Sequence, residues 1–551
     1  MSGDLPPYPP IDPTNYDLVV VGTGLPESVI SAAASSAGKS VLHLDPNPFY
    51  GSHYASLPLS DLSSFLQSHS ICPPPSPPSD KPQDFLAVDL TTRPLYSGVE
   101  INDFAPQILE EHSRKFNIDV CGPRVLFCAD KSIDLMLKSG SNHYVEFKSI
   151  HASFVGDKSG ELQSVPDSRA AIFKDKSMTL IEKNQLMKFF KLVQEHLGSA
   201  SESESMSQIS EEDLETPFVE FLEKMRLPPK IKSIVLYAIA LLDYDQDNSE
   251  TCRNLLKTRD GIDRLAVYSS SVGRFSNALG ALIYPIYGQG ELPQAFCRRA
   301  AVKGCLYVLR MPVTALLLDK DTNEYKGIRL ASGQDLFSKK LILDPSIALA
   351  LPSMSSLSNQ LRDTIHVLAP KGDSIGKVAR GICIIRGSVK ADISNLLVVY
   401  PPSTLFPEQV TAIRVLQIGC SLAVCPEGMH VLYLSTLCED TDKGKEMVKA
   451  AMNVLVTLPV LPGILESDSE ALNDISVRKP TALWRALYAQ ELIKGEIGVI
   501  SSLSMPDGNL NFSETVESAV KMYEQLFGSE ELFQEIVSEE TVDAEAEAEA
   551  D

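Results

Sequence analysis

Hydrophobic residues in the first fifty positions change their spacing twice, and the change predicts a βαβ unit. A continuous apolar run at Tyr16–Val21 has the length and composition of a buried strand. After a Gly-Thr-Gly turn, residues 25–37 are rich in Ala and Ser and predict a helix that can lie close on a sheet. Ser40–Leu44 predicts a second strand, which ends at Asp45. The chain therefore begins like a dinucleotide-binding fold.

A helical period begins near residue 179. Thr179 and Glu182 have the spacing of a capping box, and Gly198 is a fitting helix end. Apolar residues recur between them at helical spacing, at Leu186, Phe189, Phe190, Val193 and Leu197. Helices are also predicted at Phe218–Met225 and Lys230–Asp243. These three helices predict a small helical domain.

The predicted helix Lys230–Asp243 is apolar on almost every side. Such a helix is either sandwiched between other elements or offers one face to a partner, and a plain helical core is the simpler alternative. Its apolar run, Ile231–Leu242, contains Lys232 and is shorter than the ~20 residues of a membrane span. We therefore expect a buried helix or a docking helix.

The α/β pattern returns after Arg274 and predicts a domain that the helical segment interrupts. Predicted strands lie at 305–309, 313–319, 325–330, 340–343, 379–385, 396–400 and 430–435, with helices at 292–301, 443–455 and 512–526. A chain of 551 residues exceeds the usual size of one core. We predict a discontinuous α/β domain at 16–165 and 262–528 and a helical domain at 166–261. Four polar segments complete the chain, namely a disordered lead-in at 1–15, a Pro-rich insertion at 70–83, an acidic linker at 199–215 and a disordered acidic tail at 529–551.

Charge and cysteine content exclude several classes of protein. The net charge is −23, but the tail holds ten acids and the linker six, with no Lys or Arg in either, so about −7 remains for the rest (−23 + 16). There is no basic stripe for nucleic acid. The ten cysteines form no C-x-x-C pair, and the N-terminus is unlike a signal peptide. We expect free thiols in the cytosol and, without a C-a-a-X ending, no prenylation of this chain by that route.

The glycine turn departs from the dinucleotide fingerprint at one position. Gly22 and Gly24 match, Asp45 matches the ribose-binding acid, but Glu27 replaces the third glycine. A carboxylate there would repel cofactor phosphates, by roughly 4 kcal/mol for charges about 4 Å apart. We therefore expect a degenerate cofactor site without flavin. The alternative is that Glu27 turns to solvent and a flavin still binds.

Motifs for catalysis or metal binding are absent from the sequence. The nine histidines include no H-E-x-x-H pair, and there is no G-x-S-x-G or P-loop motif. His43, within the second predicted strand, is expected to be a core or edge residue of the sheet and not a general base. We predict no catalytic residue, no metal and no cofactor. The better candidates are binding residues. Tyr50 lies in a Pro-stiffened loop and is either presented at the surface or packed under the loop. Glu291 and Arg298 share a face if one helix covers both, and there they either anchor a partner or only form a local ion pair.

Three stretches resemble the superfamily of Rab GDP-dissociation inhibitors and Rab escort proteins. They are GTGLPES at 22–28, LHLDPNPFYG at 42–51 and YPIYGQGELPQAFCR at 284–298. The resemblance implies an FAD/NAD(P)-binding-like (GDI-like) large α/β domain, an inserted small all-helical domain and no bound flavin. Gln289, the Pro-rich loop and the acidic tail make the chain similar to the escort branch, of the plant type.

The resemblance also implies a function and partners. An escort protein presents newly made, GDP-bound Rab GTPases to the geranylgeranyltransferase heterodimer and delivers the prenylated Rab to membranes, without itself catalysing a reaction. A Rab recycling inhibitor is the first alternative. A flavin-dependent oxidoreductase of the amine-oxidase type is the second.

Carried over position by position, the resemblance implies two groups of site residues. Tyr50, Glu291 and Arg298 match the Rab-binding platform. The helical domain matches the part that docks on the transferase and lies near the prenyl groups, with Ile234 in place of an aromatic residue of animal escort proteins. The residues expected to face transferase or lipid are Ile231, Ile234, Val235 and Ile239.

Overall fold

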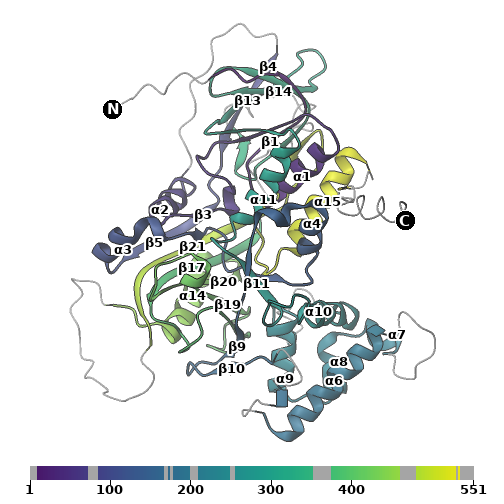
Figure 1. The fold of residues 1–551 in the computed structure, drawn as a ribbon, viewed down its shortest axis with the longest axis vertical. Coiled ribbons are helices and arrows are strands. Elements are labelled where there is room, and N and C mark those ends of the chain that lie inside the picture. The colour runs from purple at the N-terminus through teal and green to yellow at the C-terminus, as the bar shows by residue number, and fades with distance from the viewer. Residues whose placement is uncertain are drawn as a thin grey trace, which may run out of the picture.

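The computed structural model describes most of the chain and places two large β-sheets and a helical part along its long axis, with two small sheets between them (Figure 1). The described residues are 9–71, 85–166, 172–173, 178–198, 209–247, 255–350, 374–459, 479–528 and 532–533. The Pro-rich insertion lies almost entirely outside them. No helix in these ranges is long and apolar enough to cross a membrane.

The first sheet has nine strands and contains the predicted βαβ unit. β1 (Asn15–Val21), α1 (Leu25–Ser36) and β2 (Val41–Asp45) confirm that prediction to within a residue at each end. The order is β12-β2-β1-β15-β14-β13-β4-β16, and β22 also pairs with β15. β1 pairs in parallel with β2 and β15, so their carboxyl ends meet at the glycine turn. The remaining strands are β4 (Leu86–Thr92), β12 (Leu306–Leu309), β13 (Val313–Leu318), β14 (Tyr325–Leu330), β15 (Asp335–Leu343), β16 (Ile347–Leu349) and β22 (Ile500–Ser502).

Helix α1 is almost completely buried because small side chains let its neighbours approach. It packs against α11 (Glu291–Val302) and α15 (Ser513–Phe527). Ala32, Ala33 and Ala34 form part of this core. The Ala/Ser composition therefore has the packing role that the sequence predicts.

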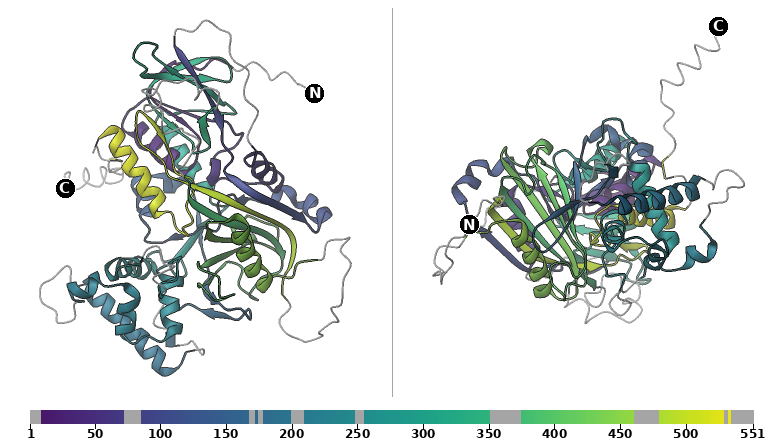
Figure 2. Two further views of the ribbon diagram at one scale, coloured as in Figure 1. Left: turned by 180° about the vertical axis from the view of Figure 1, so that it is seen from behind. Right: turned by 90° about the horizontal axis from the view of Figure 1, so that it is seen from below.

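The second sheet has eight strands in the order β10-β9-β18-β19-β20-β17-β21-β5. One face packs on α14 (Thr441–Leu455), as Figure 2 shows, and the other belongs to the large core shared with the helical part. The strands are β5 (Tyr96–Asp103), β9 (Ala152–Gly156), β10 (Leu162–Ser164), β17 (Ser374–Arg386), β18 (Leu396–Tyr400), β19 (Ile413–Gly419), β20 (Met429–Cys438) and β21 (Thr481–Ile493).

Short elements join the two sheets. The strands are β3 (Ser56–Leu57), β6 (Ile118–Asp119), β7 (Leu126–Phe127), β8 (Phe147–Ser149) and β11 (Leu282–Pro285). The helices are α2 (Leu59–Ser68), α3 (Pro106–His112), α4 (Lys131–Ser139) and the 3₁₀ turns η1 (Ser52–Tyr54), η2 (Ser113–Lys115), η3 (Ser141–Tyr144) and η6 (Cys420–Leu422).

The helical part contains α6 (Leu180–Gly198), α7 (Glu211–Glu215), α8 (Phe218–Lys224), α9 (Pro229–Ser233) and α10 (Thr258–Ser271). The capping box of α6 is confirmed, since Glu182 accepts hydrogen bonds from the Thr179 backbone (2.7 Å) and hydroxyl (3.0 Å). α10 packs on α6, α7 and α8 and spans the predicted boundary after residue 261. The proposed division into domains stays a prediction, with α10 on the helical side.

The predicted single helix Lys230–Asp243 is wrong in its form. α9 passes at Ile234 into a π-helix, η4 (Ile234–Ile239), and Leu241 then adopts a left-handed φ of 55°. The sandwiched alternative is the one observed, because η4 lies against β9, β18 and α10. The four residues expected to face transferase or lipid are at most 1% exposed, so they form core and not a docking face in this structure.

Three segments predicted to be unstructured are partly ordered, which corrects those predictions. In the linker, residues 211–215 form α7, where Glu211 pairs with Arg259 at 2.7 Å. In the lead-in, the Ile11 backbone exchanges two hydrogen bonds with the Gln334 amide. In the tail, Phe533 is buried against the α1–α15 core. Each segment has a specific partner far away in the sequence, which local composition cannot reveal.

Candidate functional site

The glycine turn after β1 is packed against two carboxyl side chains. A Cβ added at Gly22, whose φ is +97°, would lie 2.7 Å from Asp344 Cβ. A Cβ at Gly24 would lie 2.5 Å from Glu27 Oε2. The glycines therefore permit a close approach, as in a dinucleotide site, but the approaching groups belong to this chain.

Glu27 is 2% exposed, so the alternative in which it turns to solvent is wrong. Burial raises the pKa of Glu27 well above its ordinary value, and the nearby Asp344 and Asp45 raise it further. A raised pKa favours the uncharged form of the carboxyl group, and the side chain blocks the site by its volume in either protonation state. Glu27 occupies the space over Gly24 where a phosphate would need to lie.

Asp45 is used within the protein. It is fully buried and accepts hydrogen bonds from the Thr23 backbone (2.8 Å), the Thr23 hydroxyl (2.6 Å) and the Asn47 backbone (2.8 Å). The Thr23 hydroxyl in turn accepts from the Gly51 backbone at 2.9 Å. The acid that would hold a ribose therefore fixes the loop that carries Tyr50.

His43 and His53 are both buried beside this turn. Burial lowers the pKa of His43 to about 4, and its ring lies 2.5 Å from the Gly22 carbonyl, which confirms a core role. His53 pairs with Asp344 (Nε2 to Oδ1, 3.3 Å) and with the Tyr96 hydroxyl (2.9 Å). The sequence analysis missed Asp344. This residue directly follows a strand that pairs in parallel with β1, and the ends of such strands are where ligand sites usually lie, so its position could have identified it.

These groups leave no room for a cofactor pyrophosphate. The space bounded by Gly24, Glu27, His53 and Asp344 is too small to hold a water molecule. The residues that are present therefore do not fit the dinucleotide that the fold family implies, and we derive no reaction through it. We expect that the protein does not bind added FAD, so that it shows no flavin absorbance once the free FAD has been removed.

Replacing Glu27 by glutamine tests its buried, neutral state. Because the folded-state pKa is raised, the unfolded chain loses its proton first as pH rises above about 4.3. The free energy of unfolding of the wild type should therefore fall relative to Glu27→Gln between pH 5 and pH 8. Urea unfolding at several pH values measures this difference. Glu110→Gln, on the exposed face of α3, is the control, and parallel profiles for Glu27→Gln and wild type would contradict the assignment.

Two of the predicted Rab-binding residues, Glu291 and Arg298, lie on α11, and the third, Tyr50, lies in the loop after β2 and contacts the edge strand β12 beside α11. Glu291 lies in the first turn and Arg298 two turns later; burial raises the pKa of Glu291, which Arg298 partly offsets. The Glu291 carboxylate accepts from the Gln294 amide at 3.2 Å, while Arg298 is exposed. The Tyr50 ring contacts Tyr307 of β12 edge-on, at 5.8 Å between centroids. Burial raises the pKa of Tyr50, and Cys297 of α11 adds to the effect.

A buried carboxylate supports the turn that leads into α11. Asp119 accepts hydrogen bonds from the Ser56 hydroxyl (2.6 Å), the Tyr284 hydroxyl and the Gln289 backbone (2.9 Å). Burial raises the pKa of Asp119 to about 6, so it is ionised at pH 7.5. A Cβ at Gly288, whose φ is +104°, would lie 2.4 Å from Ser56 Oγ. The Tyr-Gly-Gln-Gly sequence thus encodes a tight turn tied to β3 and β6.

Sequence reasoning missed Asp119 and also Tyr287 in the same turn. Tyr287 has a left-handed φ of 74° and is 55% exposed, although its neighbour Tyr284 is fully buried. An aromatic ring held at the surface in a strained backbone conformation is a feature of binding sites. Gly288 and Gly290, on either side of Gln289, could have predicted this turn from the sequence.

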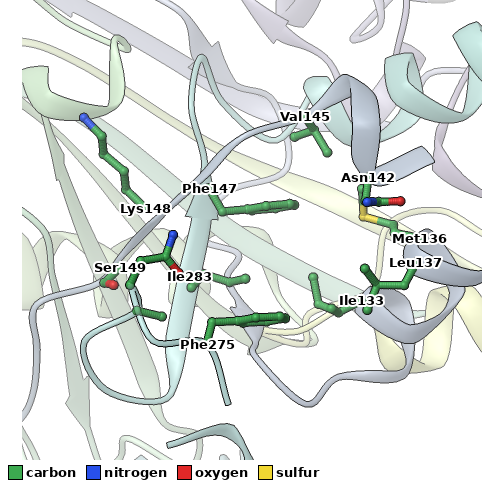
Figure 3. Close-up of a pocket in the computed structure, with 12 residues that line it drawn as sticks. Ile133, Met136, Leu137, Asn142, Val145, Phe147, Lys148, Ser149, Phe275 and Ile283 are labelled. Carbon is green, nitrogen blue, oxygen red and sulfur yellow. The ribbon is translucent and has the colours of Figure 1, made fainter. Parts of the chain in front are cut away.

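An apolar pocket of about 210 Å³ lies between α4, β8, β11 and the segment after α10 (Figure 3). The rings of Phe147 and Phe275 point into it, opposite Ile133. Its volume is below that of a typical ligand site, so it suits an apolar side chain better than a cofactor. The other lining residues are Met136, Leu137, Asn142, Val145, Lys148, Ser149, Asn277, Ala278 and Ile283.

Comparisons with known proteins show the family and the fold of the chain. The model of the GDP dissociation inhibitor family matches residues 12–100 and 87–465. The chain is 69% identical over 544 residues to Rab escort protein 1 of Arabidopsis thaliana, covering 97% of this chain and 96% of that protein. It is 28% identical over 439 residues to Rab proteins geranylgeranyltransferase component A of Drosophila melanogaster, covering 79% and 76%. The crystal structure of Rab GDI from Plasmodium falciparum has the same fold, with a TM-score of 0.65 at 20% identity over 94% of this chain and 99% of that one.

Proposed function

We propose a function from one premise: this chain belongs to the GDP dissociation inhibitor family, as a Rab escort protein. In this role it binds newly made Rab GTPases and presents them to Rab geranylgeranyltransferase for prenylation. It is an accessory component of that reaction and does not catalyse it.

The observation that carries the proposal is the group of Tyr50, Glu291 and Arg298 around α11. An exposed guanidinium, a half-buried carboxylate and an aromatic ring are strong anchors for a protein partner. Their support is rigid, because Asp119 fixes the turn before α11 and Asp45 fixes the loop of Tyr50. A preference for GDP-bound Rab follows if this surface binds the loosened switch segments better than the ordered ones.

We further propose that the helical part shelters the geranylgeranyl chains of the client. A chain of about twenty carbons gains roughly 0.8 kcal/mol for each buried CH₂, so a prenylated Rab needs a carrier in water. Ile231, Ile234, Val235 and Ile239 are closed off in this structure. A lipid chain would therefore enter only if η4 moves, and π-helical turns are frequently found at functional sites.

We propose that the protein acts in the cytosol and, during delivery, transiently at membranes. All eight cysteines that the structure describes are free thiols, and seven of them are wholly or partly buried. This state fits a reducing compartment. The degenerate cofactor site argues against a flavin-dependent oxidoreductase, and a Rab recycling inhibitor remains the alternative to be tested.

Reconstitution with Rab, transferase and geranylgeranyl donor tests the escort role. We expect transfer of lipid to Rab only when the chain is present, and none with heat-denatured chain. Transfer at the same rate without the chain would overturn the proposal. Extraction of prenylated Rab from membranes, combined with no support of prenylation, would identify a recycling factor.

A further inference from the structure

Three large apolar side chains are exposed together at the start of α6. Leu180 is 79% exposed, Ile181 70% and Phe173 64%. The Lys183 ammonium donates a 2.8 Å hydrogen bond to the Phe173 carbonyl, which places Phe173 beside the first turn of the helix. Single exposed apolar residues are common, but a cluster of this kind marks an interaction site.

Helix α6 has a buried face and an opposite face with mixed chemistry. At roughly 100° per residue, the buried residues Leu186, Phe189 and Val193 share one side. The opposite side begins with Leu180 and Ile181 and continues with Asn184, Lys188 and Lys191, which are all exposed. The apolar cluster is therefore followed by lysines on the same face, with Ile181 and Lys188 about 10 Å apart along the axis.

The charge of this region is opposite to that of the chain. The first twelve residues of α6 hold three lysines and one acid, Glu182, which is bound to the Thr179 cap. One of these lysines, Lys191, also forms a 3.4 Å surface ion pair with Glu195 in the next turn, whereas Lys188 is exposed. The whole chain has a net charge of −23. In Figure 1, α6 lies at the opposite end of the long axis from β13 and β14, so the helix that carries the cluster lies at one extremity of the molecule.

We propose that this α6 tip, formed by Phe173, Leu180, Ile181, Lys188 and Lys191, contacts the surface of an anionic lipid bilayer. The apolar side chains enter the boundary between headgroups and acyl chains, and the lysines lie against anionic headgroups. The contact would serve the delivery of prenylated Rab. This role rests on the proposed function, whereas the lipid contact itself does not.

A lipid surface fits the tip better than a folded protein partner does. A stable protein interface buries about 800 Å² on each side, which three side chains at the end of a helix do not supply. Insertion into a bilayer needs only a few apolar groups together with basic neighbours. The lysines also make the tip complementary in charge to anionic lipid. The net negative charge of the whole protein would otherwise repel such a surface.

Flotation of the full chain with lipid vesicles, without Rab or transferase, tests the contact. We expect binding to phosphatidylcholine vesicles that contain phosphatidylserine, and much weaker binding to phosphatidylcholine alone. The double variant Leu180→Ser/Ile181→Ser should lose at least tenfold in partitioning. Lys188→Gln/Lys191→Gln should lose about 25-fold, at about fivefold per lysine, and only on anionic vesicles at low salt.

The matched control is Ile497→Ser/Val499→Ser, which removes two exposed aliphatic side chains from the large domain. It should bind vesicles like the wild type, and thermal unfolding should show that all variants are folded. No binding by the wild type, or equal loss in the control, would overturn the proposal. If the α6 variants bound vesicles like the wild type but bound the transferase more weakly, the tip would instead be assigned to a protein partner. None of these outcomes depends on the escort activity.

Discussion

Arg298→Ala should weaken the binding of GDP-bound Rab by about 1–3 kcal/mol, or about 5–150-fold in Kd. The guanidinium is exposed on α11 and lies beside Glu291, so its removal takes away a planar donor without disturbing the core. Titration of GDP-bound Rab against the variant, by calorimetry or fluorescence, measures the change. In the prenylation assay the variant should need a correspondingly higher concentration.

Arg386→Ala is the control for this change. Arg386 is also exposed but ends β17 in the second sheet, so its loss removes a charge of the same kind away from α11. It should leave the Kd for Rab unchanged. Equal Kd values for wild type and Arg298→Ala would remove Arg298 from the client surface.

Asp119→Ala should cause the largest loss of stability, about 3–5 kcal/mol in the free energy of unfolding. The change leaves the Ser56 hydroxyl, the Tyr284 hydroxyl and the Gln289 backbone without their acceptor, in a fully buried place. Each unsatisfied buried donor costs about 1–3 kcal/mol, and water that enters the space recovers part of the total. The unfolding midpoint in urea at pH 7.5, where Asp119 is ionised, measures the effect.

The exposed residue Asp61 on α2 provides the comparison, since Asp61→Ala should change the midpoint only slightly. Asp119→Ala should also weaken Rab binding in the fraction that remains folded, because the turn before α11 loses its support. If its unfolding midpoint matched that of the wild type, Asp119 would not be a structural support of the α11 turn.

The sequence predicted the elements whose signals are local. The βαβ unit was placed to within a residue because an apolar run, a glycine turn and a small-residue helix follow one another directly. β21 was missed, since Thr481–Ile493 contains three Ala and three Leu, which favour helix. It is a strand because β17 and β5 pair with it on either side, and such partners are distant in sequence.

The residues of the candidate site fall into the same two groups: those in local motifs were predicted, and those that depend on the fold were not. Tyr50, Glu291 and Arg298 lie in long motifs, so a resemblance identified them together. Asp119 and Asp344 stand alone in the sequence, and their roles appear only when the fold surrounds them with donors. For Glu27, the sequence predicted a blocked phosphate site but not the reason, because burial and its effect on the pKa depend on tertiary contacts.

The link from Asp45 through Thr23 to Gly51 has a consequence for how such proteins diverge. A cofactor site is usually free to decay once its ligand is lost, because no selection maintains it. Here the surviving acid anchors, through Thr23, the backbone of Gly51 next to Tyr50. The relics of nucleotide binding would therefore persist in descendants for as long as the client surface is used.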